Sequence, residues 1–369
     1  MKKISFVMVV MMLCSIMTVN GIEPYTSAPG KSAIVMEVET GRVLFEKNSH
    51  EKMPTASTTK IMTALLAIEN VDPEKVVKIP PEAVGIEGSS IYLRANETVK
   101  MVDLLYGLML RSGNDAATAI AIEVAGSVEE FASLMTQRAR ELGAENTSFM
   151  NPHGLHHDLH YTTAYDLALI TQAAMKESLF KKIVGTKFHT AESRDAEFKY
   201  FANKNKILKT TEGGDGVKTG YTKKSGRCLV ASATRNDMQL IAISLNDYDY
   251  FNTTRKLLDD SFAIFKPHQI LQEGDVMATI SVTEGKVDTL DLLARDKVVI
   301  PVSDEEVDKI KTVVEAPDAV MAPVDQGAII GKVHTYLDGE LINTTELLAA
   351  VSIQKLTFKD KFLRFLRIK

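Results

Sequence analysis

The sequence predicts a protein of the α/β class, more narrowly α+β, in which a mostly antiparallel sheet packs against helices and a small all-β domain follows. Three observations support this prediction. Strand-like runs lie at both ends of residues 30–265 with helical patterns between them, residues 266–350 carry short Val/Ile-rich runs broken by Gly and Pro, and residues 351–369 have a helical period. With 369 residues, of which 45% are hydrophobic and 25% charged, the chain is long enough for two domains.

The first half of residues 30–265 begins as a hairpin and continues as helices. Residues 32–38 and 42–45 are strand-like, and Thr40-Gly41 forms the turn between them. Two of the helical patterns that follow begin at cap residues, Ser127 ahead of Glu130 and Thr163. The expected helices cover residues 57–68, 101–110, 116–125, 127–142 and 163–174.

From Gly213 onward the period of the sequence changes to that of strands. Residues 228–234 and 238–245 are β-rich, and Arg235-Asn236-Asp237 supplies the turn between them. A helix over residues 253–265 closes this region. Since strands come from both ends and helices from the middle, the sheet is expected to be mostly antiparallel with helices packed on it.

The N-terminus has the features of an export signal. Met1-Lys2-Lys3 is a charged start, residues 4–19 are apolar, and Val19-Asn20-Gly21 offers small residues for cleavage, so residues 1–21 are predicted to be a signal peptide removed after Gly21. The alternative is an uncleaved anchor helix, for which the apolar run is short. Only Cys228 would remain after cleavage, because Cys14 lies in the signal, so no disulfide is expected within the mature chain.

The last segment, residues 351–369, is expected to form a basic amphipathic helix. Phe358, Phe362, Phe365 and Leu366 share one face of a helical wheel, with basic residues largely opposite. Such a helix suits the surface of an anionic membrane, and the alternative is a helix docked on its own domain. The net charge of −5 and the pI near 6.0 argue against nucleic acid as a partner.

A first chemical motif lies at Ala56-Ser57-Thr58-Thr59-Lys60, just before an apolar helix. In a helix that starts here, Ser57 and Lys60 stand one turn apart on the same face, at the positive end of the helix dipole. Burial would lower the pKa of the amine and let it take a proton from the serine. Ser-x-x-Lys occurs four times in the chain, so the motif alone is weak; the alternative is a helix cap followed by a solvated lysine.

Two further motifs strengthen the first. Ser112-Gly113-Asn114 interrupts two apolar helices, where Ser112 can relay a proton and Asn114 can bind a substrate amide. Lys218-Thr219-Gly220 lies on an expected strand, where a cation and a hydroxyl can hold a carboxylate and glycine leaves room for a substrate backbone. Taken alone, the first of these motifs could be a plain turn between helices, and the second could be a solubilising lysine on an edge strand.

Together the three motifs form a known catalytic set. The chain resembles the serine-type D-alanyl-D-alanine carboxypeptidases, which are low-molecular-mass penicillin-binding proteins. Further sequence segments extend the resemblance across residues 30–265. Residues 266–350 and 351–369 resemble the C-terminal half of the family in the order of their elements more than in sequence motifs. These segments are Gly88-Ser89-Ser90-Ile91-Tyr92-Leu93, Leu110-Arg111-Ser112-Gly113-Asn114-Asp115-Ala116, Asn151-Pro152-His153-Gly154-Leu155 and Asp215-Gly216-Val217-Lys218-Thr219-Gly220-Tyr221-Thr222.

The resemblance implies a β-lactamase/transpeptidase-like domain and a role for each motif residue. Ser57 would be the nucleophile and Lys60 its base, while Ser112 with Lys218 would pass the proton to the leaving amine. Asn114 would orient the peptide, Lys218 and Thr219 would receive its carboxylate, and Gly220 would leave room for its backbone. The amide groups of Ser57 and Tyr221 would bind the oxyanion.

The resemblance also implies the partners. The substrate would be the peptidoglycan stem peptide, β-lactams would inhibit, no metal or organic cofactor would be needed, and the enzyme would be exported and peripheral on the outer face of the bacterial cytoplasmic membrane. One departure concerns the substrate carboxylate. Some members place an arginine where this chain reads Ser244-Leu245-Asn246-Asp247-Tyr248, so either Lys218 and Thr219 suffice or Arg255 reaches in.

Three other functions compete with this interpretation. A metal site on His153, His156, His157 and His160 is disfavoured because Pro152 and Gly154 indicate a loop, in which solvated histidines are expected. A class A β-lactamase would need a glutamate base between the second and third motifs, and no such segment is found. A catalytically silent wall-binding scaffold would not need all three motifs intact.

Overall fold

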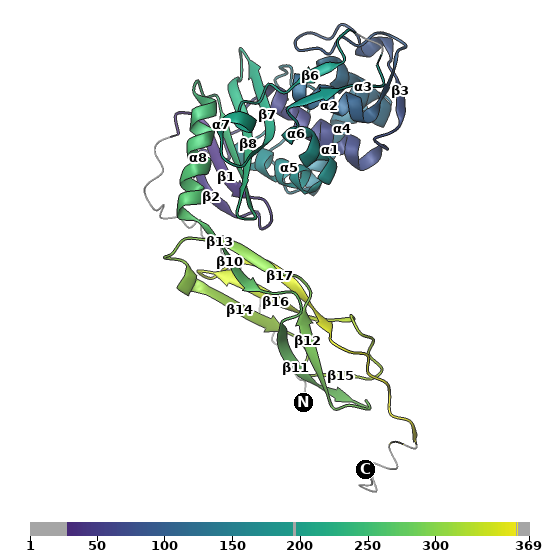
Figure 1. The fold of residues 1–369 in the computed structure, drawn as a ribbon, viewed down its shortest axis with the longest axis vertical. Coiled ribbons are helices and arrows are strands. Elements are labelled where there is room, and N and C mark those ends of the chain that lie inside the picture. The colour runs from purple at the N-terminus through teal and green to yellow at the C-terminus, as the bar shows by residue number, and fades with distance from the viewer. Residues whose placement is uncertain (1–27, 195–196, 359, 361–369) are drawn as a thin grey trace, which may run out of the picture.

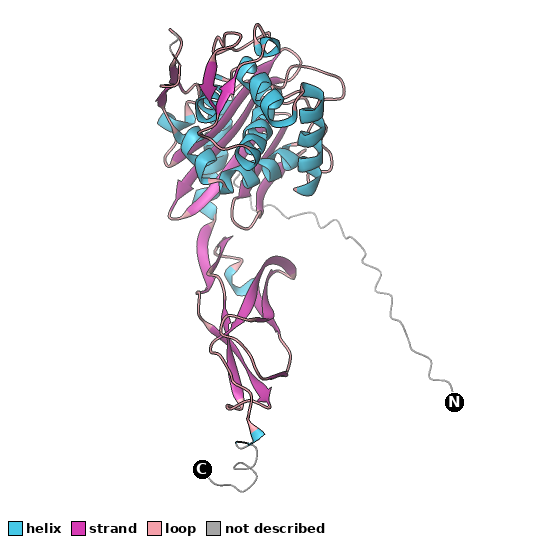
Figure 2. Cartoon of the chain, turned by 90° about the vertical axis from the view of Figure 1, so that its right-hand side faces the viewer, coloured by secondary structure: helices cyan, strands magenta, loops and turns pink. Residues whose placement is uncertain are grey.

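The computed structural model describes residues 28–194, 197–358 and 360 of the chain. An N-terminal part of mixed helices and strands is followed by an elongated part built of strands, as Figures 1 and 2 show. The predicted α+β fold class with an all-β C-terminal domain is confirmed.

The N-terminal part is organised around a five-stranded antiparallel sheet. Its strand order is β2-β1-β9-β8-β7, so the first two strands of the chain join three strands that come about 200 residues later. The expected hairpin and the expected pair around Arg235-Asn236-Asp237 are both present. The strands are β1 (Ser32–Glu37), β2 (Val43–Lys47), β7 (Gly214–Thr222), β8 (Gly226–Arg235) and β9 (Met238–Leu245).

Both faces of this sheet are covered, which explains why its inner strands read as continuous apolar runs. Alternate residues of β8 point to opposite faces: Val230 belongs to the core beneath the helices that follow β2 in the chain, whereas Leu229 belongs to a second core beneath α8 (Tyr250–Ile264). The two helical layers lie on either side of the sheet in Figure 1. Cys228 on β8 is a buried free thiol, and burial raises its pKa to about 11.

The helices between β2 and β7 follow the expected pattern with three local differences. Ser57 lies in a 3₁₀ turn, η1 (Ala56–Thr59), and the α-helix proper begins at Lys60. The helix expected over residues 101–110 becomes a π-helical turn, η3 (Gly107–Arg111), after Tyr106. The next helix already begins at Asn114.

The expected caps are present at the two later helices. Ser127 Oγ accepts a hydrogen bond from the Glu130 amide, and Thr163 Oγ1 accepts one from the Asp166 amide. The helices of this layer are α1 (Lys60–Asn70), α2 (Met101–Tyr106), α3 (Asn114–Ala125), α4 (Val128–Glu141), α5 (Ala164–Lys176) and α6 (Ser178–Gly185).

Several short elements have no clear signal in the sequence, because they are too short for a period to show. The sequence predicts neither the α6 helix nor two small hairpins and two single turns. These turns and hairpins are β3 (Val76–Lys78) with β4 (Thr98–Lys100), β5 (Phe188–Thr190) with β6 (Tyr200–Ala202), η2 (Pro81–Ala83) and α7 (Ile207–Thr210).

The C-terminal part has its own hydrophobic core, which includes Leu292, Val333 and Leu347. Its main sheet has the order β14-β16-β17-β12-β11-β15, antiparallel except for the parallel pair β11 and β15. A second sheet pairs β10 with β13. The elements are β10 (Lys266–Leu271), β11 (Val276–Thr283), β12 (Thr289–Ala294), β13 (Val298–Val302), η4 (Val307–Lys309), β14 (Ile310–Glu315), β15 (Ala319–Met321), β16 (Ile329–Leu337) and β17 (Glu340–Ala349).

The terminal helix expected from Val351 does not begin there. Ile353 and Lys355 form isolated antiparallel bridges to Val324 and Gly285, because the Ile353 side chain is buried in the core of the β-domain. Residues 359 and 361–369, which carry most of the expected amphipathic face, lie outside the described residues, as does the expected signal peptide. In the part of the chain that is described, no helix is long and apolar enough to cross a bilayer.

Candidate active site

Ser57 lies in the turn that leads into α1, close to the edge strand β7. The Thr58 hydroxyl donates to the Thr55 carbonyl at 2.8 Å, which ties this turn to the chain before it. On β7, a Cβ added to Gly220 would lie 3.1 Å from the Ser57 nitrogen and 2.9 Å from the Thr55 oxygen. Glycine therefore allows the strand backbone to approach the backbone of the serine turn.

Lys60 is fully buried and makes three polar contacts. Its Nζ lies 3.1 Å from Ser57 Oγ, 2.7 Å from Asn114 Oδ1 and 2.8 Å from the His153 carbonyl oxygen. Ser57 and Lys60 are adjacent, as the sequence predicts. Lys60 is buried, so it is not the solvated lysine of the alternative interpretation. The amine contacts the hydroxyl directly, inside the protein.

The surroundings of Lys60 favour its neutral form. Burial holds the pKa of Lys60 well below its usual value and nearby Lys218 lowers that pKa further, while Asp115 raises it and Lys204 lowers it. Burial dominates because a charged amine loses its hydration there. The site therefore contains an amine that can exist without its proton beside a hydroxyl.

The turn at residues 112–114 presents two side chains to this space. Ser112 has a left-handed backbone with φ of 66°, and α3 begins two residues later. Two hydrogen bonds fix Asn114. Its backbone nitrogen donates to the Ser89 carbonyl at 2.7 Å, and its side-chain Nδ2 donates to the Glu87 carbonyl. Its Oδ1 is thereby left to accept from Lys60.

Lys218 is the second buried amine of the site. It lies on β7, and its Nζ is 3.1 Å from Ser112 Oγ and 2.9 Å from the carbonyl oxygen of Thr219. Burial lowers its pKa to about 7, and the nearby Lys204 contributes to the shift. Two lysines with lowered pKa values therefore contact the serine turn and the residue 112–114 turn.

The eight predicted site residues fall into one region of the structure. Two pairs are linked by hydrogen bonds, Lys60 with Ser57 and Lys218 with Ser112, and Asn114 joins the first pair. Thr219, Gly220 and Tyr221 continue the same strand, with the Tyr221 side chain 65% exposed. The remaining candidate, Arg255, does not join them: it lies on α8, behind the sheet, and donates to Asn252 Oδ1 at 3.3 Å.

The loop histidines are closer to the site than the sequence suggested. The segment is indeed a loop, but His160 is only 4% exposed and its Nε2 lies 2.9 Å from Thr59 Oγ1. The expectation of solvated histidines is thus wrong for His160, and His153 contributes its carbonyl oxygen to Lys60. The only signal for these contacts was the segment Asn151-Pro152-His153-Gly154-Leu155.

Asp115 is a further residue that motif reasoning did not single out. Its carboxylate accepts hydrogen bonds from the Ser90 hydroxyl at 2.5 Å and from the amides of Ile91 and Leu93 at 3.1 Å. It thereby ties the loop beside Asn114 to the start of α3. Among the described residues, no group of three or more His, Cys, Asp or Glu is placed to hold a metal ion.

Two family models match the chain. The model described as D-alanyl-D-alanine carboxypeptidase matches residues 20–249, and that of the C-terminal domain of penicillin-binding protein 5 matches residues 265–355. The D-alanyl-D-alanine carboxypeptidase DacF of Bacillus subtilis is 34% identical over 338 residues, which are 89% of this chain and 87% of the relative. DacC of Escherichia coli is 29% identical over 93% of this chain and 89% of the relative.

The fold has a matching solved structure. Penicillin-binding protein 5 from Haemophilus influenzae aligns with a TM-score of 0.75 at 28% identity, covering 91% of this chain and all of that one. The family match covers more than half of the chain, and its three motifs converge around Ser57 in the structure. The chain therefore belongs to the D-alanyl-D-alanine carboxypeptidase family, the serine-type low-molecular-mass penicillin-binding proteins.

Proposed function

We propose that the protein is a serine carboxypeptidase that removes the terminal D-alanine from peptidoglycan pentapeptide stems through an acyl-enzyme on Ser57. The observation that carries this proposal is the contact of 3.1 Å between Lys60 Nζ and Ser57 Oγ. The contact supplies a nucleophile and a base without histidine. The relatives' names supply the substrate.

The other contacts of Lys60 support its role as the base. A neutral amine has two N–H donors and one lone pair. The Asn114 and His153 carbonyl oxygens, at 2.7 and 2.8 Å, are acceptors for the two N–H groups. The lone pair is then left for the Ser57 hydroxyl, which donates its proton as the oxygen attacks the peptide carbonyl.

A separate path serves the leaving group. Ser112 accepts a hydrogen bond from Lys218, so a proton given by the serine hydroxyl to the leaving amine can be replaced from the ammonium. The same ammonium, with Thr219, receives the terminal carboxylate of the peptide. A carboxylate bound there favours the charged form of Lys218 and raises its pKa above the value of about 7.

The tetrahedral intermediate would be stabilised by two backbone amides, those of Ser57 and Tyr221. The close approach of Gly220 to the Ser57 nitrogen supports this, because it brings β7 alongside the serine turn. Preorganised amides of this kind are commonly the largest electrostatic contribution to acyl transfer. D-alanine then leaves, and water hydrolyses the ester.

A fluorescent penicillin tests the nucleophile. The wild-type protein is expected to bind one label per chain, on the peptide containing Ser57, and Ser57→Ala is expected to bind none. Two other results would refute the proposal. Label that is released within seconds indicates a β-lactamase, and a folded wild-type protein that takes up no label indicates a silent scaffold.

The proposed location is the outer face of the cytoplasmic membrane, after export. The charged and apolar start of the chain supports cleavage and export, and the basic amphipathic pattern of residues 358–367 supports peripheral attachment. Attachment by a surface helix needs no membrane-spanning segment, and basic side chains near an anionic surface contribute about 1 kcal/mol each.

A short deletion tests the attachment. Because Ile353 and Lys355 belong to the β-domain, the deletion should begin after them, at Thr357. The protein lacking residues 357–369 is expected to leave the membrane fraction while it still releases D-alanine. Replacing Lys361, Arg364 and Arg367 by Gln should have the same effect in weaker form. A deleted protein that still pellets with membranes would exclude this anchor.

A further inference from the structure

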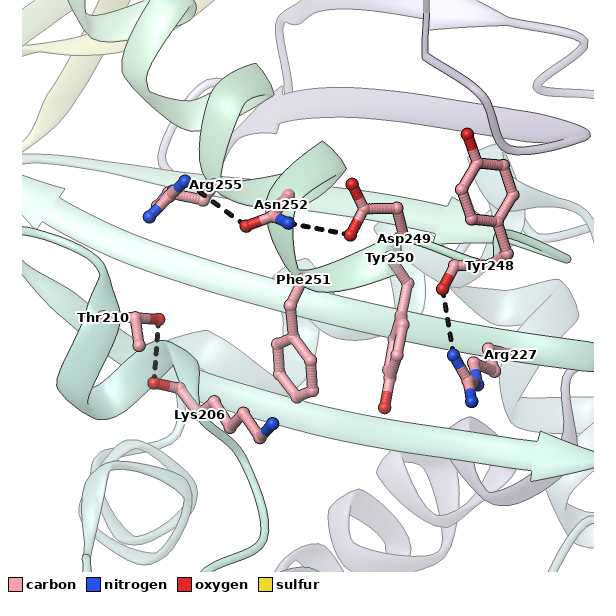
Figure 3. A pocket seen from close by; sticks show the side chains of 9 residues that line it. All are labelled: Lys206, Thr210, Arg227, Tyr248, Asp249, Tyr250, Phe251, Asn252 and Arg255. Carbon is pink, nitrogen blue, oxygen red and sulfur yellow. Dashed lines mark hydrogen bonds between the residues drawn. The ribbon is translucent and has the colours of Figure 1, made fainter.

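A cleft lies at the start of α8, on the face of the sheet opposite Lys60. Its volume is about 410 Å³, which is within the range of small-molecule sites. Figure 3 shows its lining side chains, which come from α8, the segment before it, α7 and β8. The lining residues are Lys206, Thr210, Arg227, Tyr248, Asp249, Tyr250, Phe251, Asn252 and Arg255.

The cleft has an excess of positive charge. Lys206, Arg227 and Arg255 line it, and in the described part of the chain none of them lies within 4.0 Å of a carboxylate oxygen. The single acid of the lining, Asp249, accepts from Asn252 Nδ2 at 2.8 Å instead. Three cations around one hollow, without ion-pair partners, provide a place for an anion.

Two aromatic rings form the apolar side of the cleft. The rings of Tyr250 and Phe251 lie side by side, with centroids 4.4 Å apart. Lys206 Nζ lies 5.7 Å from the Phe251 ring and the Arg227 guanidinium 5.9 Å from the Tyr250 ring, so the aromatics help to hold the cations. A neighbouring ring, Tyr248, is 78% exposed. The cleft thus combines flat apolar faces with charge.

The position of the cleft relates it to the candidate active site. Arg227 on β8 is the register partner of Tyr221 on β7, the residue whose amide is assigned to the oxyanion. The side chains of these two partners share one face of the hairpin, whereas Lys218 pairs with Val230, whose side chain lies on the other face, in the core beneath the helices. The cleft and the buried Lys218 of the candidate site therefore lie on opposite faces of one hairpin. A polymer that places one of its peptides at Ser57 has other peptides and sugars that can reach around this hairpin.

We propose that this cleft is a second binding site for peptidoglycan, which takes a free carboxylate of the glycopeptide between its cations and an adjoining sugar ring against its aromatic rings. The inference rests on the proposed function for the identity of the polymer. Arg255 and Arg227 suit a carboxylate because a guanidinium can donate two parallel hydrogen bonds to it. The site would strengthen attachment to polymer without taking part in cleavage.

Charge-removing pairs of substitutions test this site, because matched controls lie beside it. Arg255→Gln with Lys206→Gln removes two cations of the cleft, whereas Lys256→Gln with Lys209→Gln removes two cations of the same helices outside it. Each pair is made in Ser57→Ala, so that binding is measured without cleavage. The readout is the dissociation constant for purified insoluble peptidoglycan.

The cleft pair is expected to weaken binding roughly tenfold, and the control pair by less than about twofold, since an exposed charge contact contributes modestly. Amidating the carboxylates of the peptidoglycan should abolish the difference between the pairs. Equal binding by the two pairs would overturn the proposal. Binding that survives amidation and is competed by inorganic phosphate would also overturn the proposal, because the ligand would then be a phosphate.

A second measurement separates this proposal from the proposed function. With Ser57 intact, both pairs are expected to release D-alanine from a free pentapeptide as fast as the wild type. A wild-type protein that releases no D-alanine overturns the proposed function and, with it, the identity of the polymer. If the cleft pair instead releases D-alanine normally and binds peptidoglycan as tightly as the control pair, that result overturns the second site alone.

Discussion

Two buried lysines define the chemistry at the scale of single residues. Lys60 contacts Ser57 and Lys218 contacts Ser112. Burial lowers the pKa of both amines, and the charge of Lys218 lowers the pKa of Lys60 further. The proposed reaction needs them in opposite states, one neutral as the base and one charged for the carboxylate and the leaving group.

The pH dependence of activity follows from Lys218. Since its pKa is about 7 in the free protein, kcat/KM for D-alanine release is expected to fall as the pH rises through about 7 and the ammonium is lost. The fall in kcat should lie at higher pH, because bound carboxylate raises that pKa. Arginine keeps its proton throughout this pH range, so kcat/KM of Lys218→Arg should no longer fall as the pH rises, whatever activity the variant retains. An unchanged fall in this variant would contradict the assignment.

Asn114 is expected to control the protonation of Lys60. Its Oδ1 lies 2.7 Å from the amine, so Asn114→Asp would place a carboxylate there and raise the pKa of Lys60. Penicillin acylation at neutral pH should fall roughly tenfold for each unit of that rise, and recover at higher pH. Asn114→Ala, which adds no charge, serves as the control and should lose activity without such recovery.

At the scale of elements, the site depends on how closely β7 approaches the serine turn. Gly220 has no room for a side chain, and Ser112 adopts a left-handed backbone where α3 is about to begin. Asp115 then fixes the neighbouring loop by accepting from Ser90, Ile91 and Leu93. The three motifs come together because each lies at an end or an edge of a buried element.

Gly220→Ala tests this approach. The new Cβ would lie 2.9 Å from the Thr55 carbonyl oxygen, a backbone atom that cannot move aside cheaply. The strand and the turn should separate, and acylation of Ser57 should slow by roughly a hundredfold, because small displacements of catalytic groups are costly. Stability should fall by only about 1–3 kcal/mol. Acylation at the wild-type rate in a folded variant would show that the contact is unimportant.

The elements differ in how far the sequence could predict them. Helices such as α5 and strands such as β8 were predictable, because Thr163 caps the first and the apolar run at residues 228–234 marks the second. The pairing of Ser57 with Lys60 followed from helical spacing. The contacts of His153 and His160 could not be predicted, since a loop has no period and its path depends on tertiary packing.

At the scale of the whole molecule, one arginine connects the two domains. Arg42, just before β2, donates to the Pro301 carbonyl and to Glu306 of the β-domain, and its guanidinium lies 5.3 Å from the Phe265 ring. Burial alone would raise the pKa of Glu306, but the hydrogen bonds from Arg42 and Ser303 together with the charge of Arg42 outweigh burial and lower that pKa. The ion pair therefore persists at neutral pH and weakens as pH falls below the usual range of a glutamate.

Arg42→Ala is expected to loosen the domains without affecting catalysis. Small-angle scattering should show a broader range of dimensions, and proteolysis near residues 264–266 should be faster, while D-alanine release from a free pentapeptide is unchanged. Arg295→Ala, which removes a pair with Glu346 inside the β-domain, is the matched control. Identical scattering from Arg42→Ala and the wild type would show that other contacts hold the domains.

In the proposed reaction, Lys60 activates Ser57 for attack on a D-Ala-D-Ala peptide. The most direct measurement is the release of free D-alanine from a pentapeptide with that ending, by the wild type, Ser57→Ala and Lys60→Met. The wild type is expected to release one D-alanine per peptide, and each of the two variants is expected to release none above background. Release by Ser57→Ala, or no release by a folded wild-type protein, would contradict the proposed reaction.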